Sequence, residues 1–227
     1  MPKCLIQAGH VAPREPGFEA GTGASGEQPL VKAIQSKLGK LLAADPRFQV
    51  TLCPGKIPAG WKGDLFLALH ADASPSPKAS GFSFGYPPGC SECKLLADTF
   101  AAWYEQIPGA PARRGDNYTP NLTGYYGWRR TDAPAKLLVE HCFLTNPGER
   151  VWAFSHLDAI SASHYEAILH YFKLEWPEPP ARNRKRLAVL RAWILKRRRR
   201  GRSWTWIKGT RNWAEWRRRL RLRRGGR

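Results

Sequence analysis

The sequence lacks any apolar run long enough to cross a membrane. No stretch approaches the roughly 18 apolar residues that a spanning helix needs, and Met1 is not followed by an apolar leader of secretory length. We therefore expect a protein that is made in the cytoplasm without a signal peptide. Cysteine is also scarce, and the five residues are odd in number, which favours reduced thiols over a disulfide framework. Cys90 and Cys93 form a lone CxxC, which we interpret as an incidental pair rather than a zinc site.

Acidic residues are nearly absent from the end of the chain. The whole sequence has 37 basic and 18 acidic residues, but residues 177–227 contain 20 of the basic residues and only 2 of the acidic ones. Residues 1–176 are close to neutral. This distribution predicts a soluble domain over residues 1–175, a stiff Pro-rich linker over 176–181 and a cationic tail over 182–227 with a separate role.

Apolar runs alternate with helical patterns along the neutral part of the chain. This alternation predicts an α/β domain with a largely parallel sheet flanked by helices. The expected strands cover residues 3–8, 49–53, 64–69, 81–86 and 135–143, and the expected helices begin near residues 27, 91, 147 and 156. Residues 11–26 and 108–134 are expected to be long irregular connections.

The strand at residues 135–143 contains the carboxylate of Glu140 near its end. Asn146 and Pro147 follow as the N-cap and first residue of a helix. Open α/β sheets place their chemistry at the carboxyl ends of strands. A buried Glu held by an ordinary partner is the alternative interpretation of Glu140.

Three further polar residues follow strands or begin a helix. His10 and His70 each come directly after an apolar strand, and Glu27 is at the start of a helical pattern. Two histidines and one carboxylate form a ligand set of zinc hydrolases, which leave one coordination position open for water. Glu140 is then the candidate to take the proton from that water. Taken singly, Glu27 could instead be favourable charge at a helix N-terminus.

These residues also resemble a known family. The Gly9-His10 turn, the Gly-rich loop that ends at Gly26-Glu27, the stretch Leu69 to Ala73 and the stretch Leu138 to Asn146 are similar, in order and spacing, to the zinc-dependent N-acetylmuramoyl-L-alanine amidases of type 3 found in autolysins and phage endolysins. The resemblance covers residues 3–173. It implies a twisted, mostly parallel sheet, His10, Glu27 and His70 as zinc ligands, Glu140 as catalytic residue, and cleavage between N-acetylmuramic acid and L-alanine of peptidoglycan.

The chain departs from the family pattern at two places. Asp72 replaces the usual Asn, and His141-Cys142 replaces a small or apolar pair. We expect Asp72 and Arg114 near the substrate. His141 should point to the opposite face of its strand from Glu140, so we do not expect it to be a ligand. His156, His164 and His170 are expected to be ordinary helix residues.

The cationic tail has tryptophans as well as arginines. Five of the ten Trp residues lie in it, at positions 193, 204, 206, 213 and 216. A basic amphipathic helix with Trp on its apolar face is typical of binding to anionic lipid or envelope polymers. Nucleic acid is a less favoured partner, and a disordered solubilising tail is the third possibility.

We therefore predict a phage endolysin that waits in the cytoplasm and acts on the cell wall after release during host cell lysis. One alternative is a zinc peptidase or deacetylase on a related sheet. Another is a nucleic-acid-binding protein whose amidase-like domain is inactive.

Overall fold

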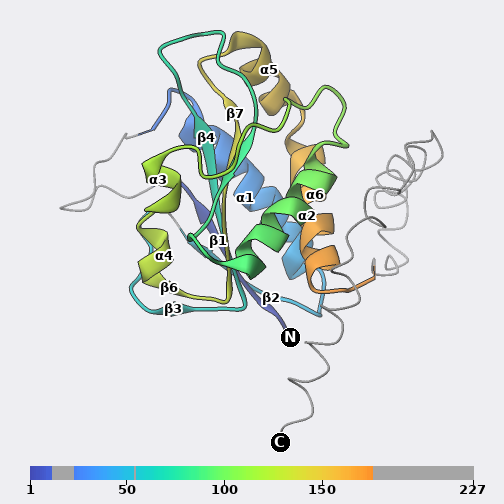
Figure 1. The fold of residues 1–227 in the computed structure, drawn as a ribbon. Coiled ribbons are helices and arrows are strands. Elements are labelled where there is room, and N and C mark those ends of the chain that lie inside the picture. Colours follow the sequence, from blue (N-terminus) through green and yellow to red (C-terminus); the bar gives the residue numbers. More distant parts are fainter. Residues whose placement is uncertain (12–22, 54, 176–227) are drawn as a thin grey trace, which may run out of the picture. The chain divides into compact units, whose positions relative to one another are not determined.

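The computed structural model describes residues 1–11, 23–53 and 55–175, which all lie in the first of two compact units of the chain. The predicted linker and tail lie outside these residues and stay predictions. In chain order the elements are β1 (Lys3–Ala8), α1 (Glu27–Ala43), β2 (Gln49–Cys53), β3 (Trp61–Lys62), β4 (Leu65–Asp72), β5 (Ser83–Gly85), α2 (Ser91–Tyr104), α3 (Pro120–Thr123), α4 (Gly127–Arg130), β6 (Thr131–Asp132), β7 (Ala135–Phe143), α5 (Pro147–Ser155) and α6 (Leu157–Tyr171) (Figure 1).

The main sheet has five strands in the order β2-β1-β4-β7-β5. The pairs β1–β2, β1–β4 and β4–β7 are parallel, and only the pair β5–β7 is antiparallel. The predicted α/β class with a mostly parallel sheet is therefore confirmed. The short parallel pair β3–β6 was not predicted, because two-residue strands leave no periodic pattern in a sequence.

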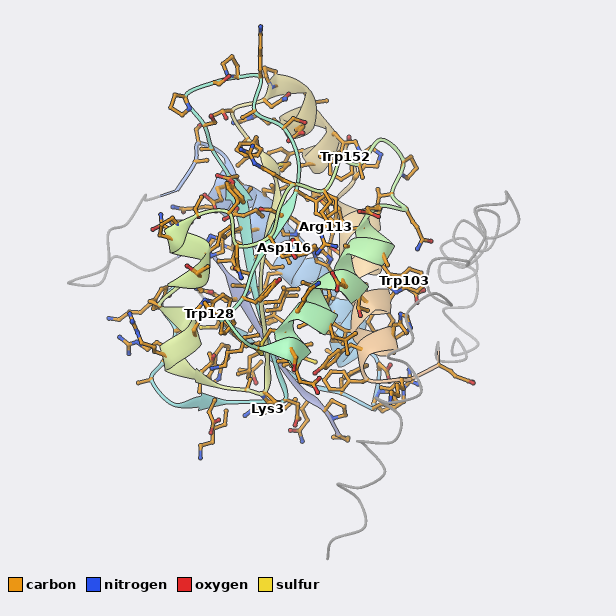
Figure 2. All side chains as sticks on the ribbon, viewed as in Figure 1. Lys3, Trp103, Arg113, Asp116, Trp128 and Trp152 are labelled. Atoms are coloured by element: carbon orange, nitrogen blue, oxygen red, sulfur yellow. A yellow bond between two sulfur atoms is a disulfide. The ribbon has the colours of Figure 1, made fainter. Side chains whose placement is uncertain are left out.

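Both faces of the sheet are buried, which explains why the strand sequences are almost continuously apolar. On one face, Ile6, Leu67 and Leu137 pack beneath α1, α2 and α6 (Figure 1). On the other face, Phe66 and Leu138 lie against the aromatic residues of the α3–α4 region. Figure 2 shows Trp128 on the α4 side and Trp103 on the α2 side.

The strand β4 extends farther than the sequence pattern predicted. The apolar run ends at Leu69, but hydrogen bonding to β7 continues to Asp72, with a shift of register between His70 and Asp72. His70 pairs directly with Glu140 of β7 in this register. The two side chains therefore leave neighbouring strands on the same face of the sheet, the face toward α3 and α4.

The helix α5 begins as predicted, with Asn146 as its N-cap and Pro147 in its first turn. The side chain of Asn146 accepts hydrogen bonds from the backbone N–H groups of Gly148 and Glu149. The carboxylate of Glu149 accepts hydrogen bonds from the backbone N–H groups of Gly81 (2.8 Å) and Phe143 (2.8 Å). Glu149 thus joins the end of β7 to the segment before β5.

Cys90 and Cys93 form a disulfide, so the prediction of reduced thiols is wrong for this pair. Cys90 is the N-cap of α2, and Cys93 is in the first turn. This i, i+3 spacing across a helical turn brings the two Cα atoms to 5.2 Å. Cys4, Cys53 and Cys142 are free and buried. No helix within the described ranges is long and apolar enough to span a membrane.

Candidate metal centre

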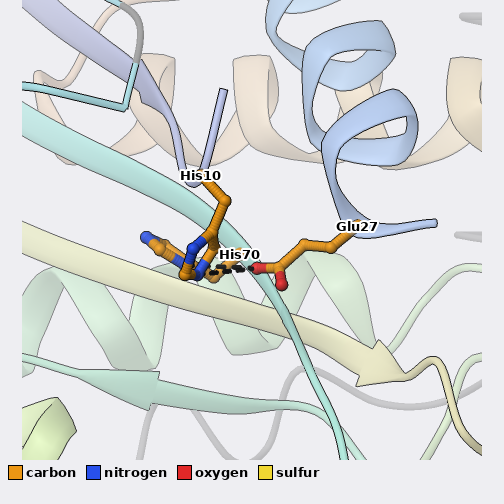
Figure 3. Close-up of side chains that lie close together, drawn as sticks. All are labelled: His10, Glu27 and His70. Atoms are coloured by element: carbon orange, nitrogen blue, oxygen red, sulfur yellow. Dashed lines mark ion pairs between the residues drawn. The ribbon is translucent and has the colours of Figure 1, made fainter. Parts of the chain in front are cut away.

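His10, Glu27 and His70 converge at the carboxyl ends of β1 and β4, as Figure 3 shows. Their potential ligand atoms all lie within 4.8 Å of one another. The Oε1 atom of Glu27 is 3.2 Å from Nδ1 of His70 and 3.6 Å from Nε2 of His10. The three residues are 17 and 43 positions apart in sequence, and the parallel sheet brings them together because β1 and β4 are neighbours with the same direction.

Glycines make room for this cluster. A Cβ atom on Gly9 would lie 2.3–2.6 Å from the imidazole ring of His70, so only glycine permits this approach. A Cβ atom on Gly23 would lie 2.6 Å from the Glu27 carboxylate and 2.7 Å from the His10 ring. His10 itself has a left-handed backbone with φ 57°, which turns the chain after β1. Close packing around the cluster therefore explains the glycines at positions 9 and 23.

Glu27 begins α1, as predicted, and its side chain is buried against the two histidines. The residue is only 2% exposed. Its Oε1 accepts a hydrogen bond from the Ala71 N–H (3.1 Å), and its Oε2 accepts one from the Ala24 N–H (2.9 Å). Favourable charge at the helix N-terminus is consequently only part of its role, because the carboxylate is aimed at the histidine pair.

The ionisation of the cluster suits a divalent cation. Burial raises the pKa of Glu27, but hydrogen bonds and charge from His70 and His10 outweigh this effect and lower it overall. Burial is also the main reason that the pKa of His10 is lowered. An ionised carboxylate beside a neutral imidazole is the protonation state that metal ligation requires. Two imidazoles and one carboxylate fit zinc, and three protein ligands leave a coordination position for water.

Glu140 lies next to this cluster, on β7. The residue is half-buried, but its Oε2 atom is fully buried and has no hydrogen-bond partner among the described residues. Burial, together with the negative charges of Asp72 and Glu27, raises the pKa of Glu140 well above its usual value. The interpretation of Glu140 as a buried Glu with an ordinary partner does not fit this unpartnered oxygen. A carboxyl group with a raised pKa beside a metal site is instead typical of a proton-transfer role.

Asp72 and Arg114 lie at the same edge of the sheet. Burial raises the pKa of Asp72, and the positive charge of Arg114 partly opposes the rise. The Arg114 guanidinium stacks over the rings of Tyr118 (4.7 Å) and Phe143 (5.2 Å). The structure thus places a cation and a carboxylate near the cluster, and their contact with substrate stays a prediction.

The sequence analysis missed the residues behind His70. The hydroxyl of Tyr125 is 3.4 Å from Nε2 of His70 and donates a hydrogen bond to Oε1 of Gln7 (2.5 Å). Gln7 in turn donates to the Gly55 carbonyl oxygen. Ligating histidines usually donate their second ring N–H to such an acceptor. A polar Gln within the apolar strand at residues 3–8 was the available signal for this arrangement.

An α/β sheet with two histidines and a carboxylate at its carboxyl edge, beside the half-buried Glu140, is an arrangement typical of a hydrolase domain. The profile of the N-acetylmuramoyl-L-alanine amidase family matches residues 4–170. The chain therefore belongs to the N-acetylmuramoyl-L-alanine amidase family. Membership of this family makes the protein a peptidoglycan amidase.

Solved structures support the same fold. The catalytic domain of CwlV, an N-acetylmuramoyl-L-alanine amidase from Bacillus (Paenibacillus) polymyxa var. colistinus, matches with TM-score 0.60 and 20% identity over 77% of this chain and 100% of that chain. The CwlD amidase of Clostridioides difficile, solved with the GerS lipoprotein, matches with TM-score 0.59 and 16% identity over 77% and 100%. The N-acetylmuramyl-L-alanine amidase of Mycobacterium smegmatis matches with TM-score 0.60 and 14% identity over 76% and 97%. A search of curated protein sequences found no significant match.

Proposed function

We propose that the protein is a zinc-dependent amidase in which His10, Glu27 and His70 hold the metal and Glu140 transfers the proton. The observation that supports this proposal most is the unpartnered Glu140 carboxylate oxygen next to a convergent His-Glu-His set. The substrate is the amide between the lactyl group of N-acetylmuramic acid and the L-alanine of the stem peptide, in keeping with the family.

A zinc ion held by His10, Glu27 and His70 would supply a bound water with a pKa near about 7 and would polarise the scissile carbonyl. Glu140 takes the proton of the attacking water and passes it to the leaving amine, so that one carboxyl group acts first as base and then as acid. The raised pKa of Glu140 makes its carboxylate a stronger base, which favours the first of these two proton transfers. Glu27 and the two histidines keep the reacting centre in place.

Arg114 is proposed to bind a carboxylate of the stem peptide. Its contacts with the rings of Tyr118 and Phe143 restrain the planar guanidinium, which suits bidentate recognition of a carboxylate. Arg114→Lys keeps the charge but loses this geometry. We expect KM for peptidoglycan fragments to rise about tenfold, which corresponds to about 1.4 kcal/mol, with little change in kcat. A change in kcat alone would contradict the assignment.

The central test is digestion of purified peptidoglycan with and without a chelator, followed by mass spectrometry of the released fragments. We expect stem peptides with a free N-terminal L-alanine, which disappear with chelator and return when zinc is added. Cuts inside the stem peptide would make the protein a zinc peptidase instead. No cleavage by folded, zinc-loaded protein would favour the binding-protein alternative.

We further propose that the cationic segment at residues 182–227 engages anionic envelope polymers or membrane lipid. Its support is the composition of the sequence, which combines high positive charge with five tryptophans. A variant that ends at Glu175 should digest purified peptidoglycan normally but lyse intact cells less well. Equal lysis by both forms would contradict this role, and salt-sensitive DNA binding by the full chain alone would favour nucleic acid.

An endolysin role is the final part of the proposal. The protein would be made in the cytoplasm and would act on the cell wall after release. Expression in a bacterial cytoplasm should then leave cells intact until the inner membrane is permeabilised. Lysis without permeabilisation would contradict it.

A further inference from the structure

His141 and His164 form a buried pair behind the candidate metal centre. Their Nε2 atoms are 2.8 Å apart, and both residues are at most 1% exposed. His141 comes from β7 and His164 from α6, on the face of the sheet opposite to Glu140, as the strand alternation predicted for His141.

The hydrogen bonds assign one proton to each ring. Nδ1 of His141 is 2.6 Å from the backbone carbonyl oxygen of His70, and a carbonyl can only accept. Nδ1 of His141 therefore carries the proton, and its Nε2 is an acceptor in the neutral ring. Nε2 of His164 must then donate to it. This leaves Nδ1 of His164 as a bare acceptor, and that atom indeed has no partner among the described residues.

The same peptide unit is bound from its other side by Glu27. A trans peptide directs its C=O and N–H in opposite directions. In the peptide that joins His70 to Ala71, the C=O accepts from His141 and the N–H donates to Glu27 Oε1 (3.1 Å). This peptide lies where the register between β4 and β7 shifts. The orientation of this peptide therefore depends on the side chains of His141 and Glu27 as well as on backbone hydrogen bonds between the strands.

We propose that His141, held by His164, is a positioning residue for the candidate metal centre. By fixing the peptide between His70 and Ala71, it orients the N–H group that holds the Glu27 carboxylate beside the two histidine ligands. The hydroxyl of Tyr104 donates to the backbone carbonyl oxygen of His141 (2.7 Å) and so anchors the backbone of β7 at this position. This inference rests on the proposed zinc site.

Two variants of the same shape test it. Asn and Leu have similarly branched side chains, but only Asn can place a donor near the position of Nδ1. In His141→Leu we expect the zinc dissociation constant, measured by calorimetry, to rise about tenfold or more, the usual effect of losing a residue that supports a metal ligand. In His141→Asn the zinc dissociation constant should stay within about threefold of the native value.

Controls separate positioning from simple stability. Ile168→Val removes a buried methyl group from α6 and should lower the thermal midpoint without changing zinc affinity, and His170→Gln changes an exposed histidine on the same helix. Equal loss of affinity in the Leu and Asn variants would reduce His141 to a packing residue, and native affinity in His141→Leu would overturn the proposal. If the native protein binds no zinc, the proposed function fails instead.

A measurement on the native protein needs no variant. Nitrogen-15 NMR of the imidazole rings should show His141 with its proton on Nδ1 and His164 with its proton on Nε2. The opposite tautomer of His141 would overturn the proposal even if His141→Leu did not fold.

Discussion

Replacement of Glu140 by Gln should remove catalysis while making the metal-free protein more stable. Gln has almost the same shape but cannot accept a proton from water. We expect kcat to fall by about 10²- to 10⁴-fold, the usual contribution of a general acid–base group. Zinc affinity should stay near the native value, because Glu140 is not among the three proposed ligands.

The stability effect follows from the raised pKa of Glu140. Burial and the charges of Asp72 and Glu27 raise this pKa, so the folded protein keeps a proton that the unfolded chain releases above about pH 4.3. Stability of the metal-free protein therefore falls as pH rises from there to the raised pKa, by at most about 1.4 kcal/mol per pH unit. Gln does not titrate, so the Glu140→Gln variant does not lose stability in this way. Between pH 5 and pH 7 the stability advantage of Glu140→Gln over the native protein should therefore grow as pH rises.

Urea unfolding of chelator-treated protein, followed by circular dichroism at pH 5, 6 and 7, measures this difference. Groups that do not interact with Glu140 titrate alike in both proteins, so their effects cancel in the comparison. Glu105→Gln, at an exposed position, is the matched control and should show no such growth. The reasoning is refuted if the Glu140→Gln advantage does not increase with pH, and the proton-transfer role is refuted if the variant keeps native kcat.

Two other predictions concern packing and charge. Gly9→Ala places a Cβ 2.3 Å from the imidazole of His70, a proposed ligand, and should weaken zinc binding about tenfold or more. The control Gly115→Ala has no heavy atom within 4 Å of its new Cβ and should bind zinc as the native protein does. Calorimetry of zinc binding distinguishes the two variants. Asp45→Asn should cost about 2–3 kcal/mol at pH 7, because Asp45 is 2% exposed and accepts bonds from Arg47 (2.7 Å) and Tyr165 (2.7 Å). Burial raises the pKa of Asp45, but these bonds outweigh burial and lower it, so this stability is present above about pH 4 and lost as pH falls through the lowered pKa. Urea unfolding should show a smaller cost of Asp45→Asn at pH 3 than at pH 7.

Local patterns in the sequence were sufficient for the main strands and helices. The strand at residues 135–143, the N-cap at Asn146 and the helix that begins at Glu27 all depend on neighbouring residues, and the structure has them at those positions. Strand ends were harder to predict. The apolar run stops at Leu69, but backbone pairing with β7 carries β4 on to Asp72, because hydrogen bonds between strands do not require apolar side chains.

The choice of His10, Glu27, His70 and Glu140 as a set came from chemistry and from resemblance, since their wide spacings form no local motif. Their meeting depends on strand order: β1, β4 and β7 are adjacent and parallel, so residues distant in sequence reach the same edge of the sheet. The sequence by itself determined which residues can ligate a metal or move a proton. Only the tertiary structure decided which groups support them, the Tyr125–Gln7 contact and the His141–His164 pair, because those hydrogen bonds join elements whose relative positions are set by packing of the whole core.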